Sequence, residues 1–313
     1  MTIDLNVLRI AVLIPCYNEE LTVGSVVSGF RTALPNADIY VFDNASTDAT
    51  RMNAIAAGAQ VRHVAIPGKG NVVRRMFADI DADIYLMADG DATYHAPSAP
   101  RLVEKLIHEH LDMVVGARKH DDADAYRLGH QLGNRLLTGT MTRIFGGRFT
   151  DMLSGYRAFS RRYVKSFPAM SHGFETETEF TIHCLELRMP YGEVETPYGV
   201  RPEGSTSKLR TYSDGIRILK TIVKLFAIER PLVFYSLLAL LLMLTGIGLA
   251  TPLLHTYLQT GLVPRLPTAI LATGLCLTAT ISLTTGIVLE TVTVGRREAK
   301  QLRYLATARY VND

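Results

Sequence analysis

The sequence contains no tryptophan and only three cysteines among its 313 residues. Cys16, Cys184 and Cys276 lie far apart and show none of the short spacings that bind a metal. A sparse, odd set of this kind indicates reduced thiols rather than a disulfide framework. The net charge is only +3, so the chain lacks the basic surplus that marks nucleic-acid-binding proteins. No nucleic acid is therefore expected as a partner.

The N-terminus also lacks the pattern of a secretory signal. It reads Met-Thr-Ile-Asp-Leu-Asn, and no basic region leads into an apolar stretch. A cleaved signal is therefore not expected. No internal repeat or low-complexity tract interrupts the chain, whose length allows one large or two ordinary domains.

The first half of the chain instead alternates apolar runs with helical segments. This alternation is typical of a doubly wound α/β domain with a mostly parallel sheet. Strands are expected at 10–14, 39–42, 61–66, 83–88 and 113–116, and helices at 20–33, 47–58, 71–81 and 97–110.

Two carboxylates, Asp89 and Asp91, follow the apolar run 83–88 with only Gly90 between them. Open α/β sheets bind ligands at the carboxyl ends of their strands. Carboxylates this close repel each other unless a cation lies between them, and hard oxygen ligands suit Mg²⁺ or Mn²⁺. A polar turn is the alternative, because Asp and Gly are common turn residues. Polar segments also follow the first two strands, and this convergence favours a metal site that binds a diphosphate.

Two segments without an ionisable residue, 232–254 and 266–289, exceed the length of about 20 residues that a bilayer crossing requires. Buried helices of a soluble protein are the alternative, but two in succession at this length are unusual. Basic residues precede the first segment and follow the second: Arg217, Lys220, Lys224, Arg296, Arg297, Lys300 and Arg303. Because positive charge marks the cytoplasmic side, we expect a multi-pass protein of the cell (inner) membrane with both termini cytoplasmic.

Residues 213–231 place apolar residues at helical spacing among basic ones. This pattern predicts an amphipathic helix in the membrane interface, and a helix that binds a partner protein is the alternative. Gly246, Gly248 and Ala250 would let the spans of two subunits pack as a homo-oligomer, although such residues also occur in monomers. The expected organisation is a cytoplasmic α/β domain (1–212), the amphipathic helix (213–231), a two-helix transmembrane hairpin (232–290) and a basic cytoplasmic tail (291–313).

Several segments resemble family-2 glycosyltransferases with the GT-A fold, a Rossmann-like α/β fold. Residues 43–48, Asp-Asn-Ala-Ser-Thr-Asp, are similar to that family's acidic pair followed by Gly-Ser-Thr-Asp, with Asn44 in place of the second acid. Residues 154–159 and 197–209 resemble segments of the polyprenyl-phosphate sugar transferases, the dolichyl-phosphate mannose and glucose synthase group. The resemblance covers about residues 8–230. The lack of tryptophan excludes the Gln-x-x-Arg-Trp motif of processive polysaccharide synthases.

The resemblance implies a role for each matching residue. It assigns Asp89 to the ribose and diphosphate of the donor and to the metal, and Asp91 to the metal. Lys69, within Gly68-Lys69-Gly70, would meet a phosphate. The full donor-binding set that it implies is Pro15, Tyr17, Asn18, Glu19, Asp43, Lys69, Asp89, Arg201 and Lys208.

The same resemblance implies an inverting transfer from a nucleotide-sugar to a polyprenyl phosphate. The attacking phosphate oxygen is already ionised, so it needs a cationic cradle more than a general base. Arg118 and Arg127 are candidates for that cradle, with ordinary solvated charges as the alternative. Glu177 or Glu179 would orient the acceptor or the sugar. The expected catalytic set is Asp89, Asp91, Arg118, Arg127, Arg157 and Glu179.

The sequence leaves the donor and the acceptor open. A UDP-sugar is favoured, because the 43–48 and Gly-Lys-Gly-Asn segments are closer to bacterial relatives that use UDP-sugars, and GDP-mannose is the alternative donor. A lipid hydroxyl acceptor would need a base, which Glu177 or Glu179 would supply. A non-catalytic membrane module is the alternative of a different class.

Overall fold

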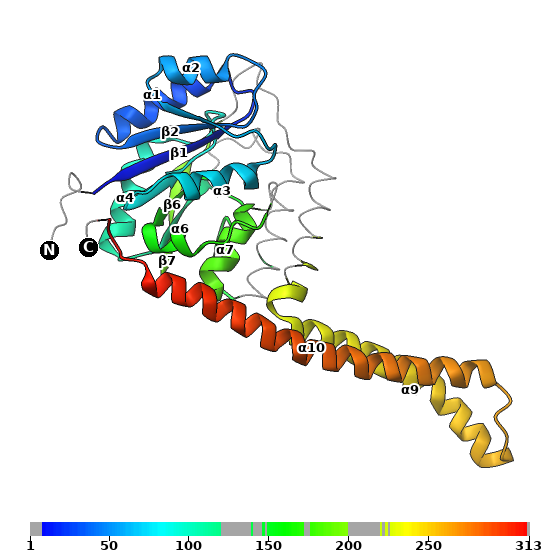
Figure 1. Cartoon of the computed structure of the whole chain (residues 1–313). Coiled ribbons are helices and arrows are strands. Elements are labelled where there is room, and N and C mark those ends of the chain that lie inside the picture. Colours follow the sequence, from blue (N-terminus) through cyan, green and yellow to red (C-terminus); the bar gives the residue numbers. More distant parts are fainter. Residues whose placement is uncertain are drawn as a thin grey trace. The chain divides into compact units, whose positions relative to one another are not determined.

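The computed structural model describes residues 8–119, 139, 146–147, 149–171, 176–199, 220, 223–224 and 226–311. The chain divides into two compact units (Figure 1). The first contains Met1–Ile218 and Lys300–Asp313, and the second contains Leu219–Ala299. The second unit is therefore an insertion in the sequence of the first.

The first unit is built on a seven-stranded sheet with the order β3-β2-β1-β4-β6-β5-β7. The strands are β1 (Ile10–Cys16), β2 (Asp38–Asp43), β3 (Gln60–His63), β4 (Ile84–Met87), β5 (Met113–Lys119), β6 (Arg157–Ser160) and β7 (Tyr191–Pro197). All neighbours are parallel except β6, which runs antiparallel to β4 and β5. The predicted mostly parallel α/β sheet is confirmed, whereas β6 and β7 are strands that the sequence reasoning missed.

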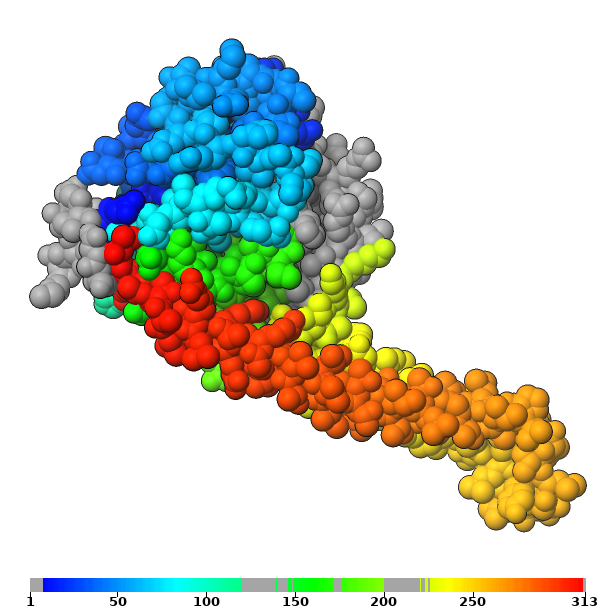
Figure 2. All heavy atoms as spheres, viewed as in Figure 1, coloured from blue at the N-terminus to red at the C-terminus, as the bar shows by residue number. Residues whose placement is uncertain are grey.

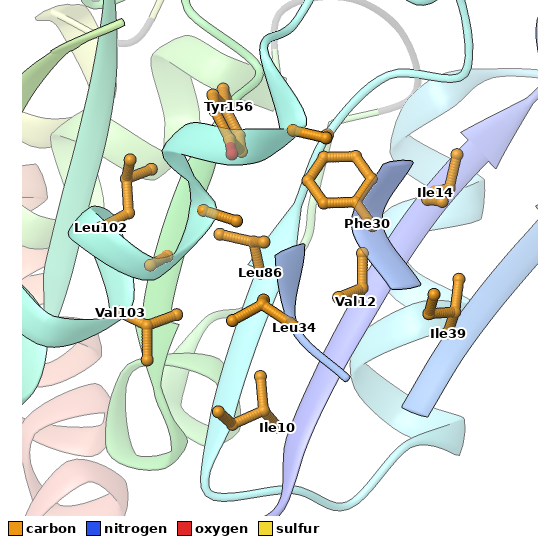
Figure 3. Packing of buried hydrophobic residues seen from close by; sticks show 14 of the residues in the cluster. Ile10, Val12, Ile14, Phe30, Leu34, Ile39, Leu86, Leu102, Val103 and Tyr156 are labelled. Atoms are coloured by element: carbon orange, nitrogen blue, oxygen red, sulfur yellow. The ribbon is translucent and has the colours of Figure 1, made fainter. Parts of the chain in front are cut away.

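Helices cover both faces of this sheet. On one face, Phe30 and Leu102 pack over Val12 and Leu86 of the sheet (Figure 3). On the other face the ring of Phe77 lies 5.8 Å from that of Phe159 and 6.0 Å from that of Phe180, centroid to centroid. The first face carries α1 (Val23–Ala33), α2 (Thr50–Ala56), the 3₁₀ helix η1 (Ala96–Ser98) and α4 (Ala99–His108), and the second carries α3 (Lys69–Asp79), α6 (Arg161–Ser166) and α7 (Thr176–Glu186).

The last residues of the chain complete the first unit. Lys300 Nζ lies 2.7 Å from Glu186 Oε2, and the Tyr304 hydroxyl donates to Asp112 Oδ2 at 2.8 Å. The backbone N–H of Val311 donates to Asp83 Oδ1 at 2.5 Å. Figure 2 shows these C-terminal residues in red against the green segment that contains α6 and α7. Part of the segment expected as a basic tail is thus helical and packed against the α/β domain.

The second unit is a hairpin of α9 (Pro231–Thr260) and the part of α10 (Leu266–Ala306) that precedes Lys300. Both helices are long and apolar enough to cross a membrane. Large apolar side chains are exposed along them, for example Leu241 at 63% and Ile270 at 65%, so neither helix is buried as a core helix within this chain. Of the expected amphipathic helix, residues 213–219, 221–222 and 225 lie outside the described part of the chain.

Two glycines let the helices of the hairpin approach closely. A Cβ added at Gly246 would lie 2.8 Å from the Cys276 sulfur, and one added at Gly286 would lie 2.9 Å from the Cβ of Tyr235. Gly246 therefore packs against α10 of its own chain rather than offering that face to a second subunit. Gly248, in contrast, has no atom within 4 Å of its added Cβ.

Candidate active site at the carboxyl edge of the sheet

Several polar segments meet at one edge of the sheet. β1, β2 and β4 end at this edge, with Cys16 paired to Asp43 across the first two strands. Because β6 is antiparallel, its first residue, Arg157, lies beside Met87 at the end of β4. The segments that follow β1, β2 and β4 and the segment that precedes β6 are therefore neighbours.

The loops after β1 and β2 are joined by side-chain hydrogen bonds. The N–H of Asn18 donates to Ser46 Oγ at 2.9 Å, and the N–H of Thr47 donates to Asn18 Oδ1 at 2.8 Å. Asn18 adopts a positive φ of 51°, which asparagine tolerates better than most residues. Tyr17 beside it is 47% exposed, and Pro15 is the second-last residue of strand β1. Asn18 thus fixes the loop in which Tyr17 is exposed.

The end of β2 carries the predicted nucleotide contact Asp43. This side chain is only 3% exposed, its Oδ1 accepts the N–H of Ser46 at 3.2 Å, and its Oδ2 lies 3.5 Å from Nδ1 of His63. The N–H of Glu19 donates to Thr50 Oγ1 at 2.7 Å. Asp43 and Glu19 thus both contact the segment that follows β2.

The hydrogen bonds of Asn44 explain why this position holds an amide, whereas the family pattern has an acid. Its Nδ2 donates to the carbonyls of Val64 and Ile66 at 3.0 and 2.8 Å, and its Oδ1 accepts the N–H of Gly68 at 2.8 Å. An ionised aspartate can only accept hydrogen bonds, so it would leave both carbonyls unpaired. Asn44 thereby positions the loop that leads to Lys69.

Lys69 lies at the centre of the site, between two carboxylates. Its Nζ is 2.6 Å from Asp89 Oδ1 and 2.5 Å from Glu177 Oε1. Burial alone lowers the pKa of Lys69, but the attraction of Asp89 and Glu177 outweighs burial and raises the pKa above its ordinary value. Lys69 is therefore a permanent cation at neutral pH, suited to contact a phosphate rather than to move a proton.

The Asp89-Gly90-Asp91 turn is packed tightly against the loop after β1. A Cβ added at Gly90 would lie 2.5 Å from the Cys16 sulfur, so only glycine fits. The Oδ1 of Asp91, a residue only 4% exposed, accepts hydrogen bonds from the N–H and hydroxyl of Thr93 at 3.2 and 2.6 Å. The side chain of Asp89 is 28% exposed. The turn thus presents one partly open carboxylate and one held in a fixed orientation.

The donor set at this turn fits a hard divalent ion. The described residues hold no group of three His, Cys, Asp or Glu side chains arranged to ligate a metal. Mg²⁺ commonly uses one or two protein carboxylates and completes its shell with substrate phosphates and water. Asp89 and Asp91 supply that number of carboxylates.

Gly155 and Tyr94 close the other side of the Lys69–Asp89 pair. The Tyr94 hydroxyl accepts the N–H of Gly155 at 2.8 Å. A Cβ added at Gly155 would lie 3.0 Å from Asp89 Oδ2 and 3.2 Å from Lys69 Nζ. Burial raises the pKa of Tyr94, and the nearby Asp89 charge raises it further. The glycine of the Ser-Gly-Tyr-Arg segment is therefore explained by its close approach to the ion pair.

Arg118, the predicted phosphate contact, forms a bidentate pair with Asp151. Its Nε lies 2.6 Å from Asp151 Oδ2 and its Nη2 lies 2.7 Å from Oδ1, and the guanidinium stacks 5.4 Å from the Tyr198 ring centroid. This pairing fixes the plane of the guanidinium and balances its charge, which the sequence reasoning did not foresee. The other predicted basic residues, Arg127, Arg201 and Lys208, lie outside the described residues.

Two residues of the expected catalytic set, Arg157 and Glu179, form hydrogen bonds with backbone groups. Arg157 is 0% exposed and donates to the carbonyl of Ser154 at 2.8 Å and to Thr181 Oγ1 at 3.1 Å. Its burial lowers its pKa. Glu179 accepts the N–H groups of Met170 and Ser171 at 2.8 and 2.9 Å, one with each oxygen.

Glu177 was predicted only as an equal alternative to Glu179, and its contact with Lys69 was missed. Residues two apart on a helix do not share a face, so Glu177 reaches Lys69 while Glu179 faces residues 170–171. That periodicity could have separated the two residues. Nothing in the sequence signals the partnership of Arg118 with Asp151.

Comparisons with known proteins identify relatives of this fold and site. A family model described as glycosyl transferase family 2 matches residues 11–167. Glycosyltransferase AglJ of Haloferax volcanii is 36% identical over 243 residues, which cover 77% of this chain and 80% of the relative. A dolichyl-phosphate hexose transferase of the same organism is 27% identical over 226 residues, 71% of this chain and 95% of the relative.

A solved structure with a similar fold contains ligands at its site. Mycobacterium tuberculosis glucosyl-3-phosphoglycerate synthase, in complex with Mn²⁺, uridine diphosphate and phosphoglyceric acid, superimposes with a TM-score of 0.56 at 26% identity. The match covers 70% of this chain and 78% of the synthase.

Proposed function

The chain belongs to glycosyl transferase family 2, and on that premise we propose that it transfers a sugar from a nucleotide-sugar to a polyprenyl phosphate at a membrane surface. The predicted GT-A-like α/β domain, followed by two helices apolar enough to span a membrane, is confirmed. The observation that carries the proposal is the cluster of Lys69, Asp89 and Asp91 at the carboxyl edge of the sheet.

This cluster matches the charge pattern of a nucleoside diphosphate bound through a metal ion. Asp89 and Asp91 would hold Mg²⁺ or Mn²⁺, which would neutralise the charge that develops on the leaving nucleoside diphosphate. Lys69 adds a fixed positive charge beside the same phosphates. The uridine diphosphate and Mn²⁺ in the mycobacterial synthase structure support a UDP-sugar as the donor. Pro15, Tyr17, Asn18, Glu19 and Asp43 would form the nucleoside side of the pocket.

The acceptor is proposed from the membrane helices together with the dolichyl-phosphate relative. A polyprenyl phosphate stays in the bilayer, so its transferase must work at the membrane surface. The positive residues Arg296, Arg297 and Lys300 near the end of α10 favour a cytoplasmic position for the catalytic unit in the cell (inner) membrane.

The chemistry of a phosphate acceptor requires no general base, because its oxygen is ionised at neutral pH. Its charge would be met by Arg118, whose orientation is fixed by Asp151, together with Arg127. Attack on the anomeric carbon from the side opposite the leaving group would invert its configuration. Arg157 and Glu179 would support this site by holding residues 152–154 and 170–171.

A lipid hydroxyl acceptor is the second candidate, and one observation favours it. Within the described part of the chain, the buried Oε2 of Glu177 has no hydrogen-bond partner, as a general base would before an acceptor binds. The other oxygen of Glu177 is occupied by the Lys69 ammonium, which opposes this role. We therefore retain the phosphate acceptor as the main proposal.

Incubation of the full chain in lipid nanodiscs with polyprenyl phosphate, Mn²⁺ or Mg²⁺ and a panel of UDP- and GDP-sugars tests both candidates. Mass analysis of the extracted lipid is expected to show polyprenyl phosphate heavier by one sugar residue. The Asp91→Asn variant is expected to lose this product. A sugar attached to diacylglycerol but never to polyprenyl phosphate would overturn the main proposal.

A further inference from the structure

We propose that Glu177 is a positioning residue. It retains Lys69 in the active site when Asp89 ligates a divalent ion. In this arrangement Lys69 passes from Asp89 to Glu177 as the metal and donor bind. The inference rests on the proposed metal-dependent function and adds a residue from α7 to it.

The geometry places one cation between two competing carboxylates. Lys69 Nζ lies within 2.6 Å of an oxygen of Asp89 and of an oxygen of Glu177. Asp89 comes from the loop after β4, whereas Glu177 is in the first turn of α7. The two carboxylates are therefore held by different parts of the fold. Lys69 starts α3, and Gly68 before it adopts a φ of 121°, so the backbone position of Lys69 is fixed by its loop.

Charge balance requires Lys69 to change partner on loading. Asp89 offers Oδ1 to Lys69 in this structure, and its Oδ2 faces the backbone of Gly155. An ammonium and a divalent ion on the same carboxylate repel each other. Lys69 therefore weakens its contact with Asp89 when Asp89 ligates a metal, and its buried ammonium then needs a protein carboxylate that holds it beside the donor phosphates. Glu177 is the anion already within reach.

The second oxygen of Glu177 gives Lys69 a place to move to. Glu177 is 5% exposed, and among the residues that the structure describes its Oε2 accepts no hydrogen bond. A buried carboxylate oxygen without a donor is costly. A shift of Lys69 toward Glu177 would supply the missing donor. The structure thus contains an unsatisfied oxygen that this shift of Lys69 would satisfy.

The alternative is that Glu177 ligates the metal directly. The two possibilities differ in their dependence on Lys69. If Glu177 only retains Lys69, its effect on metal binding disappears when Lys69 is replaced. If Glu177 is a ligand, its effect persists. A double-variant comparison therefore separates them.

The experiment measures Mn²⁺ binding to the full chain in nanodiscs with UDP present, from the electron paramagnetic resonance signal of free Mn²⁺. This readout needs no acceptor and no turnover. The variants are Glu177→Gln, Lys69→Gln and the double variant, which removes one charge of each sign. The matched control is Thr178→Val, which alters the next residue of α7, a buried threonine whose hydroxyl has no partner among the described residues.

Glu177→Gln is expected to raise the Kd for Mn²⁺ about 10- to 100-fold, the factor that corresponds to one charge-assisted hydrogen bond. The double variant is expected to bind Mn²⁺ as tightly as Lys69→Gln alone, because Glu177 then has no ammonium to retain. Thr178→Val is expected to leave the Kd within about twofold. Glu177→Asp, which keeps the charge on a shorter arm, is expected to fall between the unaltered chain and Glu177→Gln.

Two results would overturn the inference. One is a Kd unchanged by Glu177→Gln. The other is a double variant that binds Mn²⁺ more weakly than Lys69→Gln by the same factor that Glu177→Gln costs in the unaltered chain, which would make Glu177 a ligand. The double variant and Glu177→Asp keep the test decisive if a single charge removal prevents folding. A failure of the unaltered chain to bind Mn²⁺ with UDP would overturn the proposed metal-dependent function itself, and this inference with it.

Discussion

Replacement of Gly155 by alanine tests whether the Lys69–Asp89 pair is the diphosphate site. The added methyl would lie 3.0 Å from Asp89 Oδ2 and 3.2 Å from Lys69 Nζ. Lys69 Nζ is at the end of a long, flexible side chain and can move away from the methyl. The Asp89 carboxylate is on a short side chain in a tight turn and cannot. The methyl would therefore push apart the two charges that the donor must engage.

The expected loss of stability is small, because two effects oppose each other. Overpacking of this kind costs about 1–3 kcal/mol. Alanine also restricts the unfolded chain, which stabilises the fold by about 0.4–1 kcal/mol. The net destabilisation is then about 0–2.6 kcal/mol. Donor binding has no such compensation, so we expect the KM for the nucleotide-sugar to rise about 10-fold or more.

The measurement pairs a thermal melt with donor-dependent kinetics of the full chain in nanodiscs. Gly24→Ala in α1 is the matched control, because no atom lies within 4 Å of its added Cβ. It is expected to raise the free energy of unfolding slightly, by about 0.5–1 kcal/mol, and to leave the KM unchanged. A Gly155→Ala chain with an unchanged KM would refute the placement of the donor diphosphate beside Lys69 and Asp89.

Three further predictions follow from other contacts. Asn44→Asp is expected to lower transfer activity at least about 10-fold, because the carbonyls of Val64 and Ile66 lose their donors. An Asn44→Ser variant as active as the unaltered chain would contradict the role of the amide. Tyr304→Phe is expected to lower the free energy of unfolding by about 1–3 kcal/mol, since Asp112 Oδ2 loses its hydrogen bond, as measured by urea unfolding. Burial, together with the nearby Lys300 charge, lowers the pKa of His183 from 6.5 to about 3. Between pH 6.5 and pH 3 the unfolded chain therefore binds a proton at His183 that the folded chain does not, and the free energy of unfolding falls as the pH drops below 6.5. From this histidine the loss between pH 7.5 and 5.5 is about 1.4 kcal/mol, and His183→Gln should unfold with a correspondingly smaller pH dependence.

The sheet was predictable where apolar runs are long and parallel. All five expected strands are present, and Asp89 and Asp91 follow β4 as anticipated. β6 was missed because its four residues begin with an arginine and end with a serine, a pattern that does not indicate a buried strand. Arg157 is tolerated there because the carbonyl of Ser154, three residues before it, and the hydroxyl of Thr181, 24 residues after it, accept its N–H groups.

The separate parts of the site were predictable, but their pairings were not. Strand ends identify which residues approach the ligand edge, and the structure brings Lys69 to within 2.6 Å of Asp89 there. The partnership of Lys69 with Glu177 and of Arg118 with Asp151 depends on how helices and loops far apart in sequence pack. Local periodicity contains no information on such contacts.

The insertion of the hairpin within the α/β unit sets the order in which the protein can be completed during synthesis. Asp83 binds the N–H of Arg9 through Oδ2 and that of Val311 through Oδ1, so one carboxylate joins the residue before the first strand to a residue translated after the hairpin. A ribosome releases Lys300, Tyr304 and Val311 only after α9 and most of α10 have emerged. If the hairpin enters the bilayer as it is made, the catalytic unit acquires its final contacts only on a chain that is already anchored.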